Sequence, residues 1–253
     1  VADGTYYFLV NHSANTISQS ISLNAKAGTV MIMDPLTGKT GTLPTTYNSE
    51  NTTVSIYLKS GESIFLKTFE DKVNLAIPAW PDYSQSSKST DISNNWKLTF
   101  TQGQPKLPAA QTMETIKPWT STSDAEADDF SGQASYTSEF EFKKVEGKQY
   151  LLTIDKVYES AKIWINGEYA GNIWSIPYQL DVSEQLKNGK NSIKIEVANL
   201  MANSIRYLDR NGIEWRNYHE INFVNIDYKP FDASNWKTMP SGLEGKIQIS
   251  EFE

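Results

Sequence analysis

Carboxylates are the first candidates for chemistry in this sequence. Hydrolysis by a paired acid and base requires two carboxyl groups about 5–10 Å apart. Glu139 and Glu141 alternate with Ser138, Phe140 and Phe142, so they would share one face of a strand, roughly 7 Å apart. The same spacing is typical of an exposed charged face, which is the interpretation we favour. We therefore predict no catalytic residue, although a role in an enzyme stays open.

A second acidic group lies in the passage before that strand. Asp124, Asp128 and Asp129 offer carboxylate oxygens to a calcium ion, which takes about six to eight such ligands. The alternative is a solvated acidic loop. The chain has no cysteine, which excludes disulfides and zinc–thiolate sites. Its two histidines lie far apart in the sequence, so a transition-metal site is not expected.

Aromatic side chains form the third group of candidates. Trp164, Trp174 and Tyr178 could stack on the apolar face of a sugar while neighbouring amides bind its hydroxyls. Packing in a core or against another domain would use the same residue types. We name the three residues as candidate carbohydrate contacts and keep packing as the alternative.

The passage 203–216 is rich in aromatic and hydrogen-bonding side chains and has little periodicity. Asn203, Arg206, Asp209 and Trp215 are candidates for a sugar-binding or domain-docking surface. Arg206 and Asp209 could equally form a local ion pair that fixes a loop, so both interpretations stay open.

The elements that must position these residues are strands. From Phe130 to Asn199 apolar and polar residues alternate, as half-buried antiparallel strands require. Asn166-Gly167 predicts a tight hairpin turn, since both central residues of such a turn need positive φ. Trp164 has the parity opposite to Ile163 and Ile165. The final strand, from Gly245 on, is expected to pair with the strand at Trp96.

Three segments follow from the same patterns. Residues 1–72 read as a small antiparallel β-domain, residues 73–95 as a linker with Pro78 and Pro81, and residues 96–253 as a jelly-roll β-sandwich. Periodicity of the helical type is rare. The predicted fold class is therefore all-β.

The composition limits the kinds of partner that we expect this protein to bind. The formal net charge is −7 and no basic run occurs, so nucleic acid is not expected as a partner. No apolar run reaches the roughly 20 residues that span a bilayer. Abundant Trp, Tyr, Ser and Thr are typical of extracellular β proteins that handle sugars. The start at Val1 favours a processed protein or a fragment.

Several sequence motifs resemble those of known protein families. They are a Ser131-Gly132 start followed by Tyr136, the runs ESAKIWINGEYAGNIWSIPYQLDV (159–182) and LKNGKNSIKIEVAN (186–199), and PSGLEGKIQI (240–249). This part resembles the galactose-binding-like jelly-roll of glycoside hydrolase family 2. More closely, it is similar to the C-terminal part of family 106, the α-L-rhamnosidases. Residues 5–69 resemble the β-rich segment after the barrel of those enzymes.

The resemblance implies a non-catalytic, carbohydrate-binding region of a glycoside hydrolase that acts on plant or microbial polysaccharide. The family's catalytic carboxylates sit on a (β/α)₈ barrel, and this chain shows no strand–helix alternation. The implied partners are a carbohydrate and an upstream barrel. No cofactor is required, but such jelly-rolls often carry a structural calcium ion. The alternative is a stand-alone carbohydrate-binding protein, and the expected location is secreted, periplasmic or cell-surface.

Overall fold

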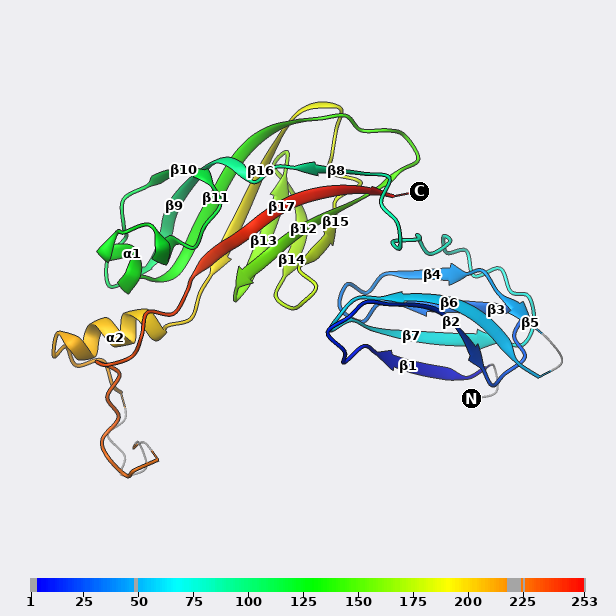
Figure 1. Cartoon of the computed structure of the whole chain (residues 1–253), viewed down its shortest axis with the longest axis horizontal. Helices are drawn as coiled ribbons and strands as arrows, with labels where there is room; N and C mark the ends of the chain where they lie inside the picture. Colours follow the sequence, from blue (N-terminus) through cyan, green and yellow to red (C-terminus); the bar gives the residue numbers. More distant parts are fainter. Residues whose placement is uncertain (1–3, 48–49, 218–223, 225, 253) are drawn as a thin grey trace. The chain divides into compact units, whose positions relative to one another are not determined.

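The computed structural model describes residues 4–47, 50–217, 224 and 226–252. The chain divides into two compact units (Figure 1). The N-terminal unit comprises Val1–Ser89, Gly147–Gln149 and Ser250–Glu253, and the C-terminal unit comprises Thr90–Glu146 and Tyr150–Ile249. In the described part of the chain, no helix is long and apolar enough to cross a membrane.

The N-terminal unit is built from two antiparallel sheets, within the residues that the structure describes. One sheet has the order β1-β7-β3-β4 and the other β2-β6-β5. The strands are β1 (Tyr6–Val10), β2 (Ile17–Leu23), β3 (Thr29–Met33), β4 (Thr40–Leu43), β5 (Thr46–Tyr47), β6 (Thr52–Leu58) and β7 (Ser63–Phe69).

Alternation along these strands places one set of side chains between the sheets. Val54 and Leu58 of β6 and Leu66 of β7 are buried, whereas Ser55 between the buried residues is exposed. Trp80 and Ile17 pack at the margin of this core. A small sandwich results, with a core separate from that of the other unit.

The C-terminal unit contains a six-stranded sheet of order β10-β9-β11-β16-β13-β14 and a four-stranded sheet of order β15-β12-β17-β8, again within the described residues. Its strands are β8 (Lys88–Asp91), β9 (Asn94–Gln104), β10 (Gln111–Thr115), β11 (Ser131–Phe142), β12 (Gln149–Tyr158), β13 (Ser160–Ile165), β14 (Glu168–Ile173), β15 (Gln179–Asp181), β16 (Gly189–Ala198) and β17 (Gly242–Phe252). Short helices are η1 (Trp119–Ser121), α1 (Ala125–Asp129) and α2 (Ala202–Arg210).

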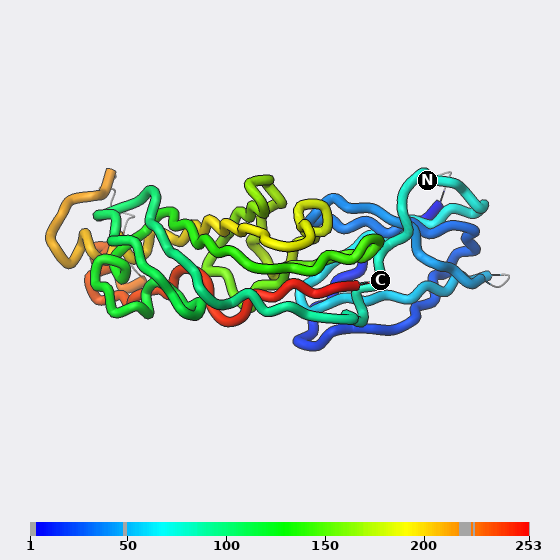
Figure 2. The backbone as a smooth tube through the Cα atoms, turned by 90° about the horizontal axis from the view of Figure 1, so that it is seen from above, coloured from blue at the N-terminus to red at the C-terminus, as the bar shows by residue number. Residues whose placement is uncertain are grey.

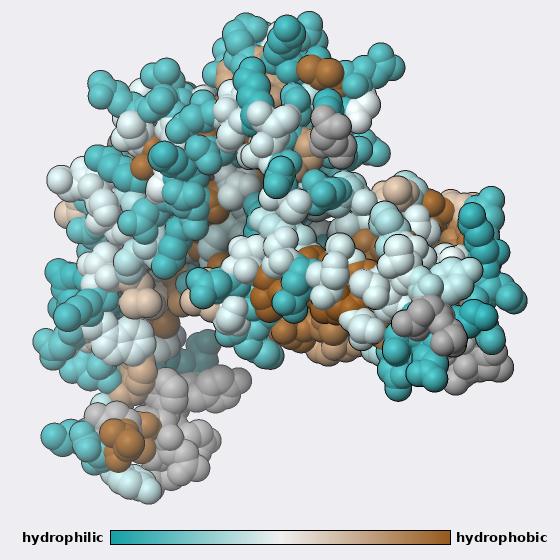
Figure 3. Space-filling model, turned by 45° about the vertical axis from the view of Figure 1, so that its right-hand side comes forward, coloured by the Kyte–Doolittle hydropathy of each residue, from teal (hydrophilic) through white to brown (hydrophobic). Residues whose placement is uncertain are grey.

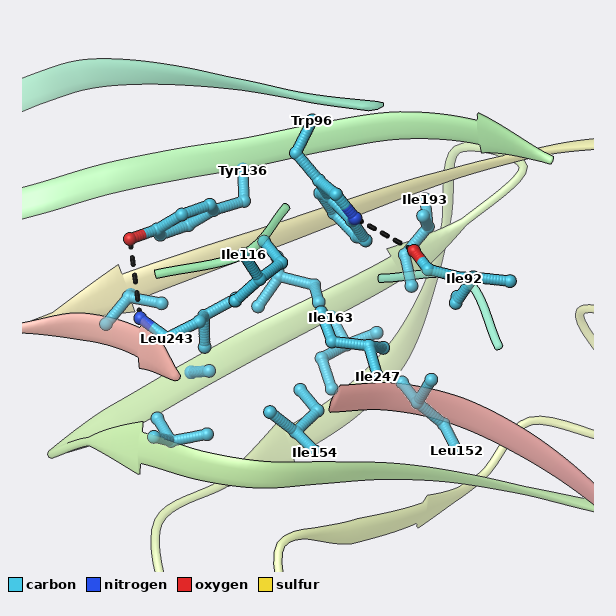
Figure 4. Close-up of a cluster of buried hydrophobic side chains, with 14 of the residues drawn as sticks. Ile92, Trp96, Ile116, Tyr136, Leu152, Ile154, Ile163, Ile193, Leu243 and Ile247 are labelled. Atoms are coloured by element: carbon cyan, nitrogen blue, oxygen red, sulfur yellow. Dashed lines mark hydrogen bonds between the residues drawn. The ribbon is translucent and has the colours of Figure 1, made fainter. Parts of the chain in front are cut away.

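The core between these two sheets is continuous and largely aliphatic (Figure 4). Ile163 and Ile193 come from the six-stranded sheet, and Ile154 comes from the four-stranded sheet. Two buried polar groups in this core have backbone partners, whereas the Trp119 indole nitrogen is buried without one among the described residues. The Trp96 indole N–H donates to the Ile92 carbonyl oxygen at 2.8 Å, and the Tyr136 hydroxyl accepts from the Leu243 backbone N–H at 3.3 Å.

The all-β prediction and the jelly-roll-type sandwich are confirmed. Asn166 and Gly167 form the tight turn between β13 and β14 with φ of 54° and 83°, as expected. The Asn166 side chain stabilises that turn by donating to the Gln185 carbonyl oxygen and to Asn191 Oδ1.

The expected pairing of the last strand is wrong. β17 lies in the four-stranded sheet beside β12 and β8, whereas β9, which carries Trp96, pairs with β10 and β11. The chain crosses between the two sheets at Ser93, whose hydroxyl accepts from the Ile247 N–H at 2.9 Å. β17 and the segment near residue 90 run side by side (Figure 2).

Strand β8 lies inside the segment 73–95 that the sequence pattern marks as a linker. The division into residues 1–72, 73–95 and 96–253 stays a prediction about independent domains.

Candidate functional site

The outer face of the six-stranded sheet holds a hollow with a volume of about 890 Å³. Inward positions of these strands, such as Leu98 and Ile195, are buried, so the alternate positions must face outward. The hollow crosses the strands rather than following one of them. Its lining includes Asn95, Lys97, Thr112, Thr137, Ser138, Glu139, Trp164, Ser192 and Lys194.

The strand register places one outward residue from each strand in a single row. Thr112 of β10 is paired with Lys97 of β9, and Lys97 with Thr137 of β11. Thr137 is paired with Lys194 of β16, and Lys194 with Trp164 of β13. Tyr169 of β14, opposite Trp164, ends this cross-strand row. Neighbouring strands are about 4.8 Å apart, so the row is roughly 24 Å long.

Trp164 is half-buried at one end of the hollow, between two neighbours. The Lys194 ammonium lies 3.7 Å from the centroid of the indole ring, a cation–π contact. The Tyr169 ring centroid is 5.6 Å away on the strand at the sheet edge. The indole is thus fixed by packing, and it fixes the position of the Lys194 ammonium in turn.

Carboxylates on this face do not form a catalytic pair. Glu139 and Glu141 are both exposed, and Glu139 forms an ion pair with Lys190 at 2.7 Å. Of the residues that line the hollow, only Glu139 carries a carboxyl group. The interpretation as an exposed charged face therefore agrees with the geometry.

Trp174 and Tyr178 lie in the connection between β14 and β15 and do not line this hollow. Trp174 is 59% exposed. Tyr178 is half-buried and packs against the core, and its carbonyl oxygen accepts from the Ile154 N–H at 3.0 Å. Carbohydrate contact by these two residues stays a prediction.

Asn203 and Arg206 of α2 are buried, and their polar atoms point into the protein. The Asn203 side chain donates to the Met239 carbonyl oxygen and accepts from the Met239 N–H, at 2.9 and 2.8 Å. Arg206 forms an ion pair with Asp129 at 2.6 Å. The ion pair between Arg206 and Asp209, one of the two interpretations left open, is not formed, and the Asp129 carboxylate of α1 lies against Arg206 instead.

Asp209 binds the segment that follows α2. One carboxylate oxygen accepts from the Trp215 indole N–H at 2.7 Å and lies 3.3 Å from the Arg216 guanidinium. The other oxygen accepts from the Ala233 N–H at 2.7 Å. These contacts show a structural use for Asp209 and Trp215, and their contact with a carbohydrate stays a prediction.

The three predicted calcium ligands have different partners. Asp124 caps α1 by accepting from the Glu126 N–H, and it also accepts from Gln111. Asp129 pairs with Arg206, and burial raises the pKa of Asp128. No group of three or more potential ligands that could hold a metal ion occurs among the described residues. The arrangement fits a calcium ion poorly, and that site stays a prediction.

The N-terminal unit has a different kind of surface. Most outward positions of β1, β7 and β3 carry large apolar side chains, which are Tyr6, Phe8, Met31, Met33, Phe65 and Phe69. Lys67 lies among them, with its ammonium group 5.2 Å from the Tyr6 ring centroid and 4.6 Å from that of Phe69. Phe8 is 57% exposed, and its ring centroid lies 4.7 Å from that of Phe65. An apolar patch is visible on this unit in Figure 3. We refer to these six residues as the apolar sheet face.

Sequence reasoning found Trp164 but missed Lys97, Thr112, Thr137 and Lys194. Alternation assigned Thr137 and Lys194 to the polar faces of their strands, yet it gave no register between strands that are distant in the sequence. The row can be recognised only when the pairing of the strands is known.

Comparison with known proteins assigns the fold to a family. The profile described as "Glycosyl hydrolase 2 galactose-binding domain-like" matches residues 96–234, which is more than half of the chain. The chain therefore belongs to this family of galactose-binding-like domains. The domain type that the sequence motifs indicated is confirmed.

Individual relatives are longer than this chain. Two proteins of Formosa agariphila, each named "Putative beta-glucuronidase", are 26% identical over 117 residues and 32% identical over 101 residues. The matches cover 45% and 38% of this chain but only 10% and 9% of those proteins.

A solved rhamnosidase from Novosphingobium sp. PP1Y has the same fold over 99% of this chain, with a TM-score of 0.76 and 22% identity. The match covers 23% of that enzyme. Both β units thus have a counterpart within a larger enzyme, and the fold expected from the rhamnosidase resemblance is confirmed.

Proposed function

We propose that this chain is a non-catalytic β-sandwich region of a glycoside hydrolase, with a catalytic barrel supplied by another part of the parent protein. Membership of the galactose-binding-like family supports this proposal. So does the small share of each relative that the chain covers, since those proteins carry most of their length elsewhere. The substrate class that we propose is a plant or microbial polysaccharide, handled outside the cytoplasm.

The apolar sheet face is the surface through which we propose that this chain packs against another domain of the parent enzyme. Contiguous exposed apolar patches on soluble proteins mark surfaces that contact another partner. Phe8, Phe65 and Met33 are neighbours across strands β1, β7 and β3, so their side chains form one continuous surface. Packing against a further domain of the parent enzyme would cover this surface.

A stand-alone carbohydrate-binding protein is the second candidate. The hollow on the six-stranded sheet favours it, because hydroxyl groups and an indole line an open surface. Hydroxyl side chains bind sugar hydroxyls, and aromatic rings bind the apolar faces of sugars.

Activity assays on the purified chain separate the candidates. Aryl α-L-rhamnoside and aryl β-D-glucuronide should both remain intact, and either rate above the buffer control would contradict a non-catalytic role. Adding the parent's separately produced catalytic domain should give a complex that Phe8→Ser weakens. Ser18→Ala, an exposed change on the other sheet of the same unit, is the matched control. Glycan binding with no such complex would favour the stand-alone protein instead.

A further inference from the structure

We propose that the cross-strand row Thr112–Lys97–Thr137–Lys194–Trp164–Tyr169 is a binding groove for an acidic saccharide, one that carries carboxylate or sulfate groups. The inference rests on the proposed function and adds the class of ligand and the surface that binds it. The saccharide lies across the strands, along the row, with its anionic groups at the two lysines.

The charges in the row are of one sign. Lys97 and Lys194 lie on either side of Thr137, so two strand spacings, about 10 Å, separate their backbones. No acidic residue occurs in the row. Two lysines whose backbones are about 10 Å apart on one sheet face fit an extended polymer with repeated negative charges, since each charge can meet one ammonium group.

Nearby acidic residues do not neutralise both lysines. Glu139, the carboxylate in the hollow, forms its ion pair with Lys190 at 2.7 Å. Glu196 lies 3.8 Å from Lys194, at the outer limit of an ion pair, and is cross-strand to Lys162. Lys97 has no carboxylate within ion-pair distance among the described residues. At least one ammonium group is therefore available for an anionic ligand.

The Lys194 side chain is ordered by its neighbours before any ligand binds. Its ammonium group lies 3.7 Å from the Trp164 ring centroid, and its side chain is 41% exposed. A lysine that is already ordered loses less conformational entropy when it binds. Lysine acts as a point charge, so the row selects negative charge without distinguishing carboxylate from sulfate.

The remaining positions of the row suit a sugar ring. Thr112 and Thr137 present hydroxyl groups beside the lysines, and both line the hollow. Tyr169 is 52% exposed at the end of the row next to Trp164. A saccharide that follows the row would meet hydroxyl groups between its charged contacts and an aromatic pair at one end.

Calorimetric titration of the full chain tests the proposal. The probes are an oligogalacturonate, a sulfated galactan oligosaccharide, and the carboxyl-reduced form of the oligogalacturonate, which keeps the sugar chain and loses the charge. Both acidic probes should bind more tightly than the reduced form. Their affinity should fall as salt is raised, because exposed charges are screened beyond about 10 Å at 0.1 M ionic strength.

Variants locate the site. Lys97→Gln and Lys194→Gln should each weaken binding of the acidic probes about two- to fivefold, and the double variant about tenfold. Lys156→Gln and Lys246→Gln, both at exposed positions of the four-stranded sheet, remove the same net charge from the same unit and leave the partners of Glu139 and Glu196 in place. These two controls should change the affinity less than about twofold.

Three results would overturn the proposal. Equal losses in the controls would show a non-local effect of net charge. If the carboxyl-reduced saccharide binds as tightly as the acidic one and the double variant keeps that binding, the chain binds carbohydrate but not through this row. Absence of binding to all three saccharides would remove the carbohydrate-binding role as well as the groove.

Discussion

Tryptophans in the C-terminal unit show how differently one residue type can be used. Trp119 is fully buried, and its ring packs against Phe100, Phe130 and Tyr136 at centroid distances of 5.8 to 6.4 Å. Trp174 is 59% exposed. The stabilisation that a side chain contributes depends on the apolar area that it buries. Trp119 therefore stabilises the fold, whereas Trp174 contributes little to stability and offers its ring for recognition.

Substitution of these two tryptophans should separate the roles. Trp119→Ala should lower the free energy of unfolding by about 3–5 kcal/mol, since it leaves a large cavity. Trp174→Ala should change it by about 0.5 kcal/mol or less. Chemical denaturation measures both. A large loss for Trp174→Ala would show that this side chain is covered in solution, contrary to the structure.

Tyr158 is a single residue whose contribution to the stability of the folded state depends on pH. Its hydroxyl donates to a Glu244 carboxylate oxygen, and this bond, together with burial and the negative charge of Glu244, raises the pKa of Tyr158 to about 12. A folded-state pKa above the unfolded value of about 10 means that the folded state holds the proton more tightly. The stabilisation is therefore present below pH 10 and is lost as the pH rises toward 12.

The stability difference between the native chain and Tyr158→Phe should accordingly shrink over that alkaline range. Urea denaturation at a series of pH values measures it. Glu244→Gln, which keeps an acceptor but removes the charge, should shift the window to lower pH. A difference that stays constant from neutral pH to pH 12 would contradict the assignment.

At the scale of elements, α2 acts as an attachment point for the chain that leads to β17. Asn203 binds both backbone groups of Met239, and its side chain also donates to the Ser241 hydroxyl at 3.3 Å. Asp209 binds the segment at Trp215 and Ala233. Sequence spacing along α2 gives no sign of this role, because the partners other than Trp215 lie 24 to 38 residues further on.

Asn203→Ala should lower the free energy of unfolding by about 1–3 kcal/mol, because it removes the hydrogen bonds that the buried Asn203 side chain forms with both backbone groups of Met239. Asn211→Ala, at the exposed C-terminal end of the same helix, is the control, with an expected change of about 0.5 kcal/mol or less. Thermal unfolding followed by circular dichroism compares the variants. Equal effects would argue against the attachment role of α2.

At the scale of the whole molecule, two separate cores stabilise the chain. Leu66 is fully buried in the N-terminal unit and Ile163 in the C-terminal unit, and the two residues belong to different hydrophobic clusters. Each unit has enough buried apolar side chains for its own cooperative transition.

Leu66→Ala and Ile163→Ala should therefore act on different transitions in differential scanning calorimetry. Each should destabilise its own unit by about 2–5 kcal/mol, the usual loss for a buried aliphatic side chain. The midpoint of the other transition should stay within the error of the native chain. A single transition that both variants lower equally would show that the units unfold together.

Much of the fold could be predicted from local pattern. Alternation from Phe130 to Asn199 identified the strands, and Asn166-Gly167 identified a turn, because both depend on neighbouring residues and on φ. The same parity argument placed Trp164 on the face opposite to Ile163 and Ile165, and the structure shows these two isoleucines buried and Trp164 half-buried.

Only the tertiary structure decided which strands pair and which side chains meet. β17 joins β12 and β8 instead of the strand at Trp96, and Arg206 meets Asp129 instead of Asp209. Lys97 and Lys194 lie in one row through the register of β9, β11 and β16. Sequence periodicity is a local property that fixes the face on which a side chain lies, whereas register depends on contacts between residues distant in the sequence.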